Sequence, residues 1–185
     1  MSTRPLTPPV TADDVCRRLM VDRYARSFCL PRYTPAGWWE CDLLEITEAG
    51  YWREYEIKLT RADFRADQEK TREVLPRAYG QPVVRERKHQ LLASTQRGPC
   101  QFYYVLPTGL IAPTELPSWA GLLEFSETPG RARPWNIHTR LVVQAPRRHA
   151  DKIDPAVERH ARGVVYWRWM KMLLHDRHAI EGDAP

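Results

Sequence analysis

The side chains that could do chemistry lie on two neighbouring segments that read as strands, with Asp42 on the first and Glu56 and Lys58 on the second. Cutting a phosphodiester bond takes a hard divalent cation held by carboxylate oxygens, a water held in line and a positive charge near the transition state. Asp42 and Glu56, with the carbonyl oxygen of Ile57, can bind such a cation, Mg²⁺ or Mn²⁺. Lys58 points to the same side as Glu56, roughly 7 Å further along the strand. Its ammonium can orient the water, take part in its deprotonation or stabilise the transition state, so the spacing is compatible with metal-assisted hydrolysis.

Two strands joined by a tight turn are expected to position these groups. Residues 38–47 and 51–59 are rich in aromatic and aliphatic side chains, and a short glycine-containing turn separates them. In the second strand, alternation places Glu54, Glu56 and Lys58 on one face and apolar side chains on the other. The alternative is that these charges form the solvated face of an antiparallel strand, with ordinary ion pairs. The pattern by itself leaves both interpretations open.

A second acid-x-Lys triplet, Glu86-Arg87-Lys88, shows how short the motif is. It lies in a polar stretch predicted to be helical, and no upstream strand carries an acid that could join it. Glu56 and Lys58, by contrast, interrupt an apolar strand, where unpaired charges are costly. The context therefore favours the first triplet as the site.

Helices and strands alternate along the rest of the chain. Capping residues begin helices at Thr11, Thr60 and Asp154, of which the first is expected to run to residue 26 and the second to residue 75. Further expected elements are a helical piece at 85–94 and strands at 27–33, 101–106, 120–125 and 141–143. This order predicts one mixed α/β domain over residues 11–178, with flexible segments at 1–10 and 179–185. Trp167 and Trp169 in the last helix are expected to be packing residues, and that helix fits a role in capping the sheet or in forming a dimer.

Charge and composition narrow the function classes. The chain has 185 residues, a net charge of +5 and a pI of about 9.2, which suits a polyanionic partner such as DNA. No apolar run reaches the ~18 residues of a membrane span, and the N-terminus lacks the layout of a signal peptide. We therefore expect a soluble, cytoplasmic protein without membrane contact. The four cysteines are far apart, which argues against a zinc site and predicts reduced thiols that are buried or have no special role.

Lysine is scarce in this chain, because the 28 basic residues are mostly arginine. Arginine would supply the same charge, so a lysine at a given position suggests that the compact ammonium group is needed there. The lysines are Lys58, Lys70, Lys88, Lys152 and Lys171.

Several runs of residues carry a resemblance to a known family. They are Cys41-Asp42-Leu43-Leu44-Glu45-Ile46, Glu56-Ile57-Lys58-Leu59-Thr60, and Asp63-Phe64 with Asp67, followed by Lys88-His89-x-Leu91 and Phe102-Tyr103-Tyr104-Val105. Over residues 38–126 the chain is similar to the PD-(D/E)XK nuclease superfamily, most closely to its phage-encoded and MmcB-like DNA-repair branch. The resemblance implies a restriction-endonuclease-like α/β core, a central mixed sheet flanked by helices, with an added C-terminal helix. It also implies that Asp42 and Glu56 are magnesium ligands and that Lys58 is the catalytic lysine.

Other residues could assist these three. Asp63 is either a helix cap alone or also a catalytic group. Lys70, Lys88 and His89 could face the phosphate or could belong to solvated helix surface. Alternation places Glu45 on the face opposite Asp42. DNA contacts are expected from arginines, which bind phosphate bidentately: Arg61, Arg65, Arg72, Arg85 and Arg87, with Arg147 and Arg148 further along.

The expected function is cleavage of DNA by a magnesium-dependent endonuclease of phage or bacterial DNA repair, without an organic cofactor; a homodimer is compatible with this function. One alternative is a catalytically silent nuclease fold that binds DNA or a repair partner and does not need Lys58. The other is a phage structural or interaction protein with an apolar contact surface. Its contact residues would be Trp38, Trp39, Trp52, Trp119 and Trp135.

Overall fold

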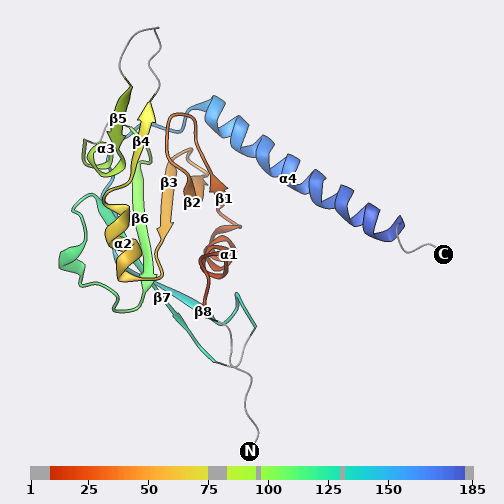
Figure 1. The fold of residues 1–185 in the computed structure, drawn as a ribbon, viewed down its shortest axis with the longest axis horizontal. Helices are drawn as coiled ribbons and strands as arrows, with labels where there is room; N and C mark the ends of the chain where they lie inside the picture. The colour runs from red at the N-terminus through yellow and green to blue at the C-terminus, as the bar shows by residue number, and fades with distance from the viewer. Residues whose placement is uncertain (1–8, 75–82, 95–96, 130–131, 182–185) are drawn as a thin grey trace, which may run out of the picture.

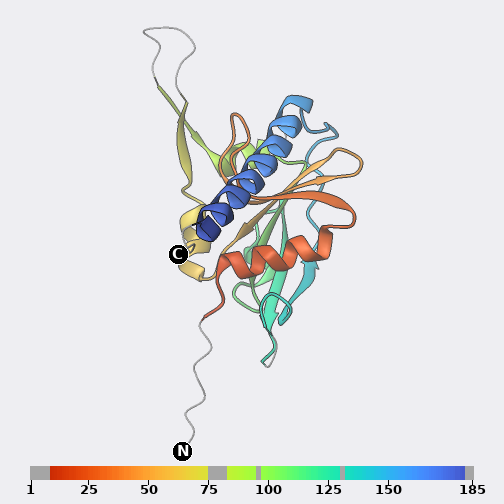
Figure 2. The ribbon, with the colours of Figure 1, turned by 90° about the vertical axis from the view of Figure 1, so that its right-hand side faces the viewer.

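A six-stranded mixed sheet forms the centre of the computed structural model, which describes residues 9–74, 83–94, 97–129 and 132–181 (Figures 1 and 2). The strands are β1 (Ser27–Tyr33), β2 (Cys41–Thr47), β3 (Trp52–Ile57), β6 (Gln101–Pro107), β7 (Ala120–Glu127) and β8 (Ile137–Val143), in the spatial order β1-β2-β3-β6-β7-β8. β1, β2 and β3 form an antiparallel meander, β6 and β7 continue parallel to β3, and β8 returns antiparallel. Most of the predicted flexible ends lies outside the described residues.

Helices cover both faces of this sheet. They are α1 (Ala12–Arg23), α2 (Arg61–Asp67), α3 (Lys88–Ser94) and α4 (Pro155–Glu181), with a 3-10 turn at Pro113–Glu115. On one face, Val15 of α1 shares a core cluster with Tyr55 of β3. On the other, Phe64 of α2 and Leu92 of α3 share a cluster with Tyr104 of β6. The predicted mixed α/β class is therefore confirmed, and β3 lies between two buried layers.

Two predicted helix boundaries are wrong, because a two-stranded ribbon lies between α2 and α3. Thr71–Val74 (β4) and Val84–Arg87 (β5) pair antiparallel and extend from the body next to α3 (Figure 1). The helix expected to reach residue 75 ends at Asp67, and the one expected from residue 85 begins at Lys88. Cross-strand ion pairs stabilise the ribbon, such as that between Arg72 and Glu86 at 2.6 Å. A helix-based interpretation of charged residues misses such cross-strand pairs.

The three helix starts predicted from capping residues are confirmed. Thr11 accepts a hydrogen bond from the backbone N–H of Asp14 and forms a capping box with it. Asp154 Oδ1 accepts from the backbone N–H of Ala156 at 2.7 Å at the start of α4. α1 ends at Arg23, earlier than expected, and β8 is longer than the predicted strand at 141–143. Capping chemistry therefore located helix starts better than the sequence pattern located helix ends.

α4 packs on the sheet through its N-terminal half and then extends from the body (Figure 1). Val157 and Ala161 join a core cluster with residues of β1 and β2. Trp167 and Trp169 are 66% and 53% exposed, so the prediction that they are packing residues is wrong. The reason is local, because the side of the helix that meets β1 there carries Arg168, which donates to the carbonyl oxygens of Pro31 and Arg32.

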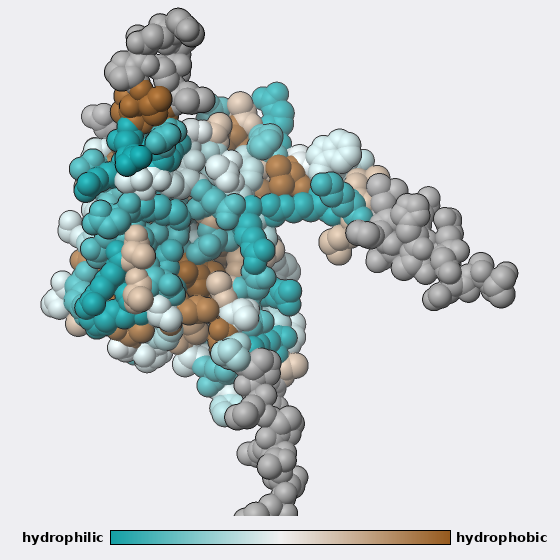
Figure 3. All heavy atoms as spheres, in the orientation of Figure 1, coloured by the Kyte–Doolittle hydropathy of each residue, from teal (hydrophilic) through white to brown (hydrophobic). Residues whose placement is uncertain are grey.

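The surface and the thiols agree with the composition. Hydrophilic side chains cover much of the face formed by α2, α3 and the β4–β5 ribbon (Figure 3). Among the described residues, no helix is both long enough and apolar enough to cross a membrane. All four cysteines are free thiols, and Cys16, Cys41 and Cys100 are buried, as predicted.

Candidate functional site

Glu54 and Glu56 are buried on the face of β3 that α2 and α3 cover. The parallel register with β6 places Glu54 beside Phe102 and Glu56 beside Tyr104. Their exposed fractions are 0% and 2%. The interpretation that these charges form a solvated strand face is therefore wrong, and the cost of burying them must be met by close partners.

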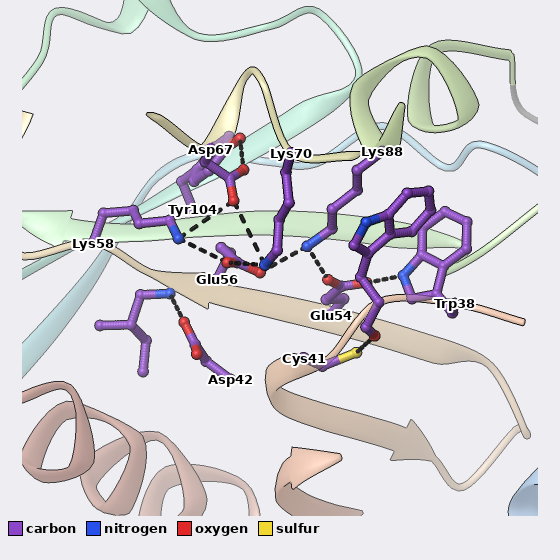
Figure 4. Close-up of polar contacts among 12 residues, drawn as sticks. Trp38, Cys41, Asp42, Glu54, Glu56, Lys58, Asp67, Lys70, Lys88 and Tyr104 are labelled. Atoms are coloured by element: carbon purple, nitrogen blue, oxygen red, sulfur yellow. Dashed lines mark hydrogen bonds and ion pairs between the residues drawn. The ribbon is translucent and has the colours of Figure 1, made fainter. Parts of the chain in front are cut away.

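Those partners are three lysines, each from a different part of the chain (Figure 4). Lys58, just beyond β3, lies 2.7 Å from Glu56 Oε1, and Lys70, just before β4, donates to the same oxygen at 3.1 Å. Lys88, the first residue of α3, donates to Glu56 Oε2 at 2.7 Å and lies 2.7 Å from Glu54 Oε1. Three of the five lysines thus converge on one carboxylate. The scarcity of lysine in the sequence had indicated that these residues were worth attention. We call this group of lysines with Glu54, Glu56 and Asp67 the lysine–carboxylate network.

Asp67, the last residue of α2, is the third buried carboxylate of the network. Tyr104 donates to its Oδ2 at 2.7 Å, His89 Nε2 lies 3.0 Å from the same oxygen, and Lys58 Nζ lies 3.3 Å from Oδ1. Burial alone would raise the pKa of Asp67, but the hydrogen bond to His89 and the charges of Lys88 and Lys58 outweigh it and hold the pKa well below its ordinary value. The sequence pattern assigned no role to Asp67 beyond the resemblance.

The charged groups of the network shift one another's pKa values and so favour their ionised forms in most cases. Burial opposes ionisation of Glu56, but the nearby ammonium of Lys88, above all, keeps its pKa below the ordinary value. Burial would likewise lower the pKa of Lys58, yet the charges of Glu56 and Asp67 raise it. Burial raises the pKa of Glu54 in spite of Lys88, while the indole N–H of Trp38 donates to its Oε2 at 2.7 Å. At neutral pH Lys58 is therefore a cation that donates protons to hydrogen bonds, and Glu56 is a carboxylate.

Asp42 lies on β2 next to the network and outside its chain of ion pairs (Figure 4). Its Oδ2 accepts a hydrogen bond from the backbone N–H of Ile57 at 2.7 Å, which links β2 to the end of β3. Burial and the charge of Glu56 raise the pKa of Asp42. Asp42, Lys58, Asp67 and Lys70 line one surface pocket. The predicted lysine and one predicted metal ligand therefore line the same pocket.

The donor chemistry of Asp42 and Glu56 suits a hard divalent cation, because carboxylate oxygens are the ligands that Mg²⁺ takes. In this structure, however, most of the carboxylate oxygens of Glu56 and Asp42 already have hydrogen-bond partners. Both oxygens of Glu56 are held by ammonium groups, and one oxygen of Asp42 accepts from Ile57. Within the described residues, no three His, Cys, Asp or Glu side chains are grouped to hold a metal ion. A cation could reach Glu56 Oε1 only after an ammonium has left it.

The assisting residues divide into two groups. Lys70 and Lys88 belong to the network and His89 contacts its Asp67, so the interpretation that places these three residues on a solvated helix surface is wrong. Lys88 is also part of the triplet that the sequence context had set aside. Asp63 acts as a cap, since its carboxylate accepts from the Thr60 hydroxyl at 2.7 Å, and it lines the pocket as well.

Glu45 lies on the opposite face, as predicted, and is paired there with Arg23 and Arg53. It therefore does not compete with Asp42 for a cation.

The predicted DNA-contacting arginines differ in what they already bind. Arg61 is held by Glu115 and the carbonyl of Leu110, and Arg72 by Glu86. Arg85 and Arg87 are 68% and 55% exposed in ion pairs at 3.1 and 4.0 Å. Arg65 is exposed as well, on α2. The freest cations among those predicted therefore lie on α2 and on the β4–β5 ribbon.

The expectation that Arg148 contacts DNA does not fit the structure, because its side chain is buried and supports the fold. Its guanidinium donates to four backbone carbonyl oxygens, at distances from 2.6 to 3.0 Å. It joins the end of α3 to the loop before β6, and four of its five N–H donors are used in these bonds, so it cannot bind a phosphate bidentately. The sequence offers no sign of this, because the acceptors are main-chain atoms.

The five tryptophans proposed as a contact surface do not form one. Trp38 and Trp39 are 4% and 6% exposed, and Trp52 and Trp119 pack against the same core cluster. Trp135 alone of the five is largely exposed, at 56%. Four of these side chains therefore support the fold.

Comparisons with known proteins add little to this geometry. No protein family and no curated protein matches the chain. Among solved structures, the chain is similar to one described as SPO1766 protein of unknown function from Silicibacter pomeroyi. The two share 21% sequence identity with a TM-score of 0.46, over 92% of this chain and 88% of that chain. A likeness of this degree carries no argument about activity.

Proposed function

We propose that this chain is a divalent-cation-dependent nuclease of the PD-(D/E)XK type that hydrolyses DNA phosphodiester bonds. The observation that carries the proposal is the placement of Asp42, Glu56 and Lys58. Lys58 Nζ lies 2.7 Å from Glu56 Oε1, and Asp42 on the adjacent strand is bonded to the backbone between them. Asp42 and Lys58 open to one pocket, where a phosphate group could lie.

The topology supports the same proposal. A restriction-endonuclease-like core would need an acidic strand hydrogen-bonded to a Glu-x-Lys strand within a mixed sheet flanked by helices. β2 and β3 pair antiparallel, β6 continues the sheet in parallel, and α1, α2 and α3 cover the two faces. α4 corresponds to the added C-terminal helix that the resemblance implies.

The roles follow from the charges. A magnesium ion bound here would be held by Asp42, Glu56 and the carbonyl oxygen of Ile57, and would supply Lewis-acid activation of phosphate and water. Lys58 is protonated at neutral pH, since its pKa is raised. It is therefore placed as a hydrogen-bond donor and a fixed charge that orients water and stabilises the developing negative charge. Asp67 positions Lys58 through its ion pair at 3.3 Å.

The substrate class rests on cations near the pocket. Arg65 lies on α2, which borders the pocket, and Arg85 and Arg87 lie on the adjoining ribbon. Arginines at such positions bind the phosphate backbone without reading the bases, so we expect DNA binding with weak sequence preference.

A second candidate is a catalytically silent fold of the same type that binds DNA. The observation that favours it is the state of Glu56, whose two oxygens are both engaged by ammonium groups. If the network never opens, the three lysines and three carboxylates serve stability alone.

One experiment separates the two candidates. Supercoiled plasmid and end-labelled single-stranded DNA are incubated with the protein in Mg²⁺, Mn²⁺ or EDTA, alongside Lys58→Ala and Asp42→Asn, with Lys152→Ala as an exposed-lysine control. The nuclease predicts cutting that needs the cation, persists in Lys152→Ala and is lost in the other two variants. Equal DNA binding by all four proteins without cutting in any cation would contradict it and favour the silent fold.

A further inference from the structure

Lys70 has no part in the proposed chemistry, yet it occupies the predicted metal ligand. Its Nζ lies 3.1 Å from Glu56 Oε1 and 3.9 Å from Asp67 Oδ1. Lys58 is already bonded to the same Glu56 oxygen, so this oxygen accepts two ammonium groups. An oxygen with two cationic donors has no room for a third cation, and one donor has to leave before a metal ion can bind.

The three lysines differ in their freedom to leave. The side chain of Lys88 is fully buried between Glu54 and Glu56, and its departure would leave two buried carboxylates unpaired. Lys58 is 15% exposed and is held by both Glu56 and Asp67. Lys70 is 32% exposed, lies between α2 and β4, and lines the open pocket. It is therefore the ammonium that can move into solvent at the lowest cost.

The charges of the site point the same way. Counted by formal charge and with Asp42 included, the site holds four carboxylates and three ammonium groups, which leaves one negative charge in excess. Exchange of Lys70 for a divalent cation gives four positive charges against four negative ones. The exchange therefore balances a partly buried site, where an unbalanced charge is costly.

We propose that Lys70 is a placeholder for the divalent cation. Its ammonium neutralises Glu56 Oε1. A cation bound to this oxygen would take the place of that ammonium, which would then turn away from Glu56 toward the solvent side of the pocket that Lys70 lines with Asp42 and Lys58. There the freed ammonium binds a phosphate group of the DNA. The proposal rests on the proposed function, since it assigns the regulation of the same site.

Binding of Mn²⁺ without DNA, measured by titration calorimetry, tests the competition. Lys70→Gln removes the competing charge and should bind Mn²⁺ about tenfold more tightly than the wild type. Lys70→Arg keeps the charge and should show no such gain, and Lys152→Gln should match the wild type. Circular dichroism of each variant establishes that it is folded. Equal or weaker binding by folded Lys70→Gln would overturn the placeholder while leaving the nuclease in place, whereas no binding by any variant would overturn both.

Lysine labelling of the wild-type chain gives a second readout that needs no substitution. The protein is treated with an amine-acetylating reagent in Mg²⁺ or in EDTA, and each lysine is quantified by mass spectrometry. Displacement predicts that Mg²⁺ raises the labelling of Lys70 several-fold, while Lys88 stays protected and Lys152 is labelled equally in both. Unchanged or lower labelling of Lys70 in a protein that binds the cation would overturn the proposal.

Discussion

The most informative perturbation of the network is Lys88→Met, which removes one buried charge and keeps much of the side-chain volume. The Lys88 ammonium is fully buried and lies 2.7 Å from both Glu54 and Glu56. Without it, Glu54 retains the uncharged indole N–H of Trp38 and the Cys41 thiol, and Glu56 retains Lys58 and Lys70 on its other oxygen. Removal of one partner from a buried ion pair costs about 3–5 kcal/mol.

Urea unfolding at pH 7, followed by tryptophan fluorescence, measures this loss. Lys88→Met should lower the free energy of unfolding by about 3–5 kcal/mol, and the exposed control Lys152→Met should change it by less than about 0.5 kcal/mol. Adding Glu54→Gln to Lys88→Met should recover part of the loss, because the unpaired charge is then gone. A loss below about 1 kcal/mol in Lys88→Met would refute the reasoning that these charges are excluded from water and stabilise one another.

The same variant should respond to pH in a defined direction. Without Lys88, the folded-state pKa of Glu54 rises further above its unfolded value. Stability from such a group is present below the unfolded pKa and is lost as the pH rises through the folded one. The deficit relative to the wild type should therefore shrink between pH 7 and pH 5, and a deficit that grows over this interval would contradict the assignment.

Three further outcomes are expected. Because the pKa of Asp67 is depressed, its charge stabilises the fold at pH values above its ordinary pKa of 3.8, and this contribution is lost as the pH falls further. Asp67→Asn should therefore make the free energy of unfolding less dependent on pH in the acid range, and an unchanged dependence would count against the network. Arg148→Ala should destabilise the fold by about 3 kcal/mol in urea, because four carbonyl oxygens lose their donor; a loss under about 1 kcal/mol would show that water replaces it. Arg85→Ala combined with Arg87→Ala should weaken DNA binding and reduce the slope of log K against log salt by about 2; an unchanged slope would place the DNA elsewhere.

The sequence predicted the local parts of the site because their signals are local. Strand alternation and one turn were enough to place Glu54, Glu56 and Lys58 on one face, and Thr60 with Asp63 marked the next helix. The same signals could not show that this face is buried. Burial depends on α2 and α3, whose packing comes from distant contacts.

The rest of the network needed tertiary structure. Lys88 reaches Glu56 across 32 residues, and it does so because a ribbon, not a helix, precedes α3. The scarcity of lysine was a usable signal, yet it could not say which lysines converge. The burial of Arg148 had no signal in the sequence, since backbone carbonyls are its partners.

The central claim is tested most directly by the single-turnover rate of DNA cutting in Mg²⁺, with protein in excess over supercoiled plasmid. The account predicts that Lys58→Ala cuts at least about 100-fold more slowly than the wild type, with Lys152→Ala unchanged, because the Lys58 ammonium stabilises the transition state. Equal rates for wild type and folded Lys58→Ala, or cutting that continues unchanged in EDTA, would contradict it.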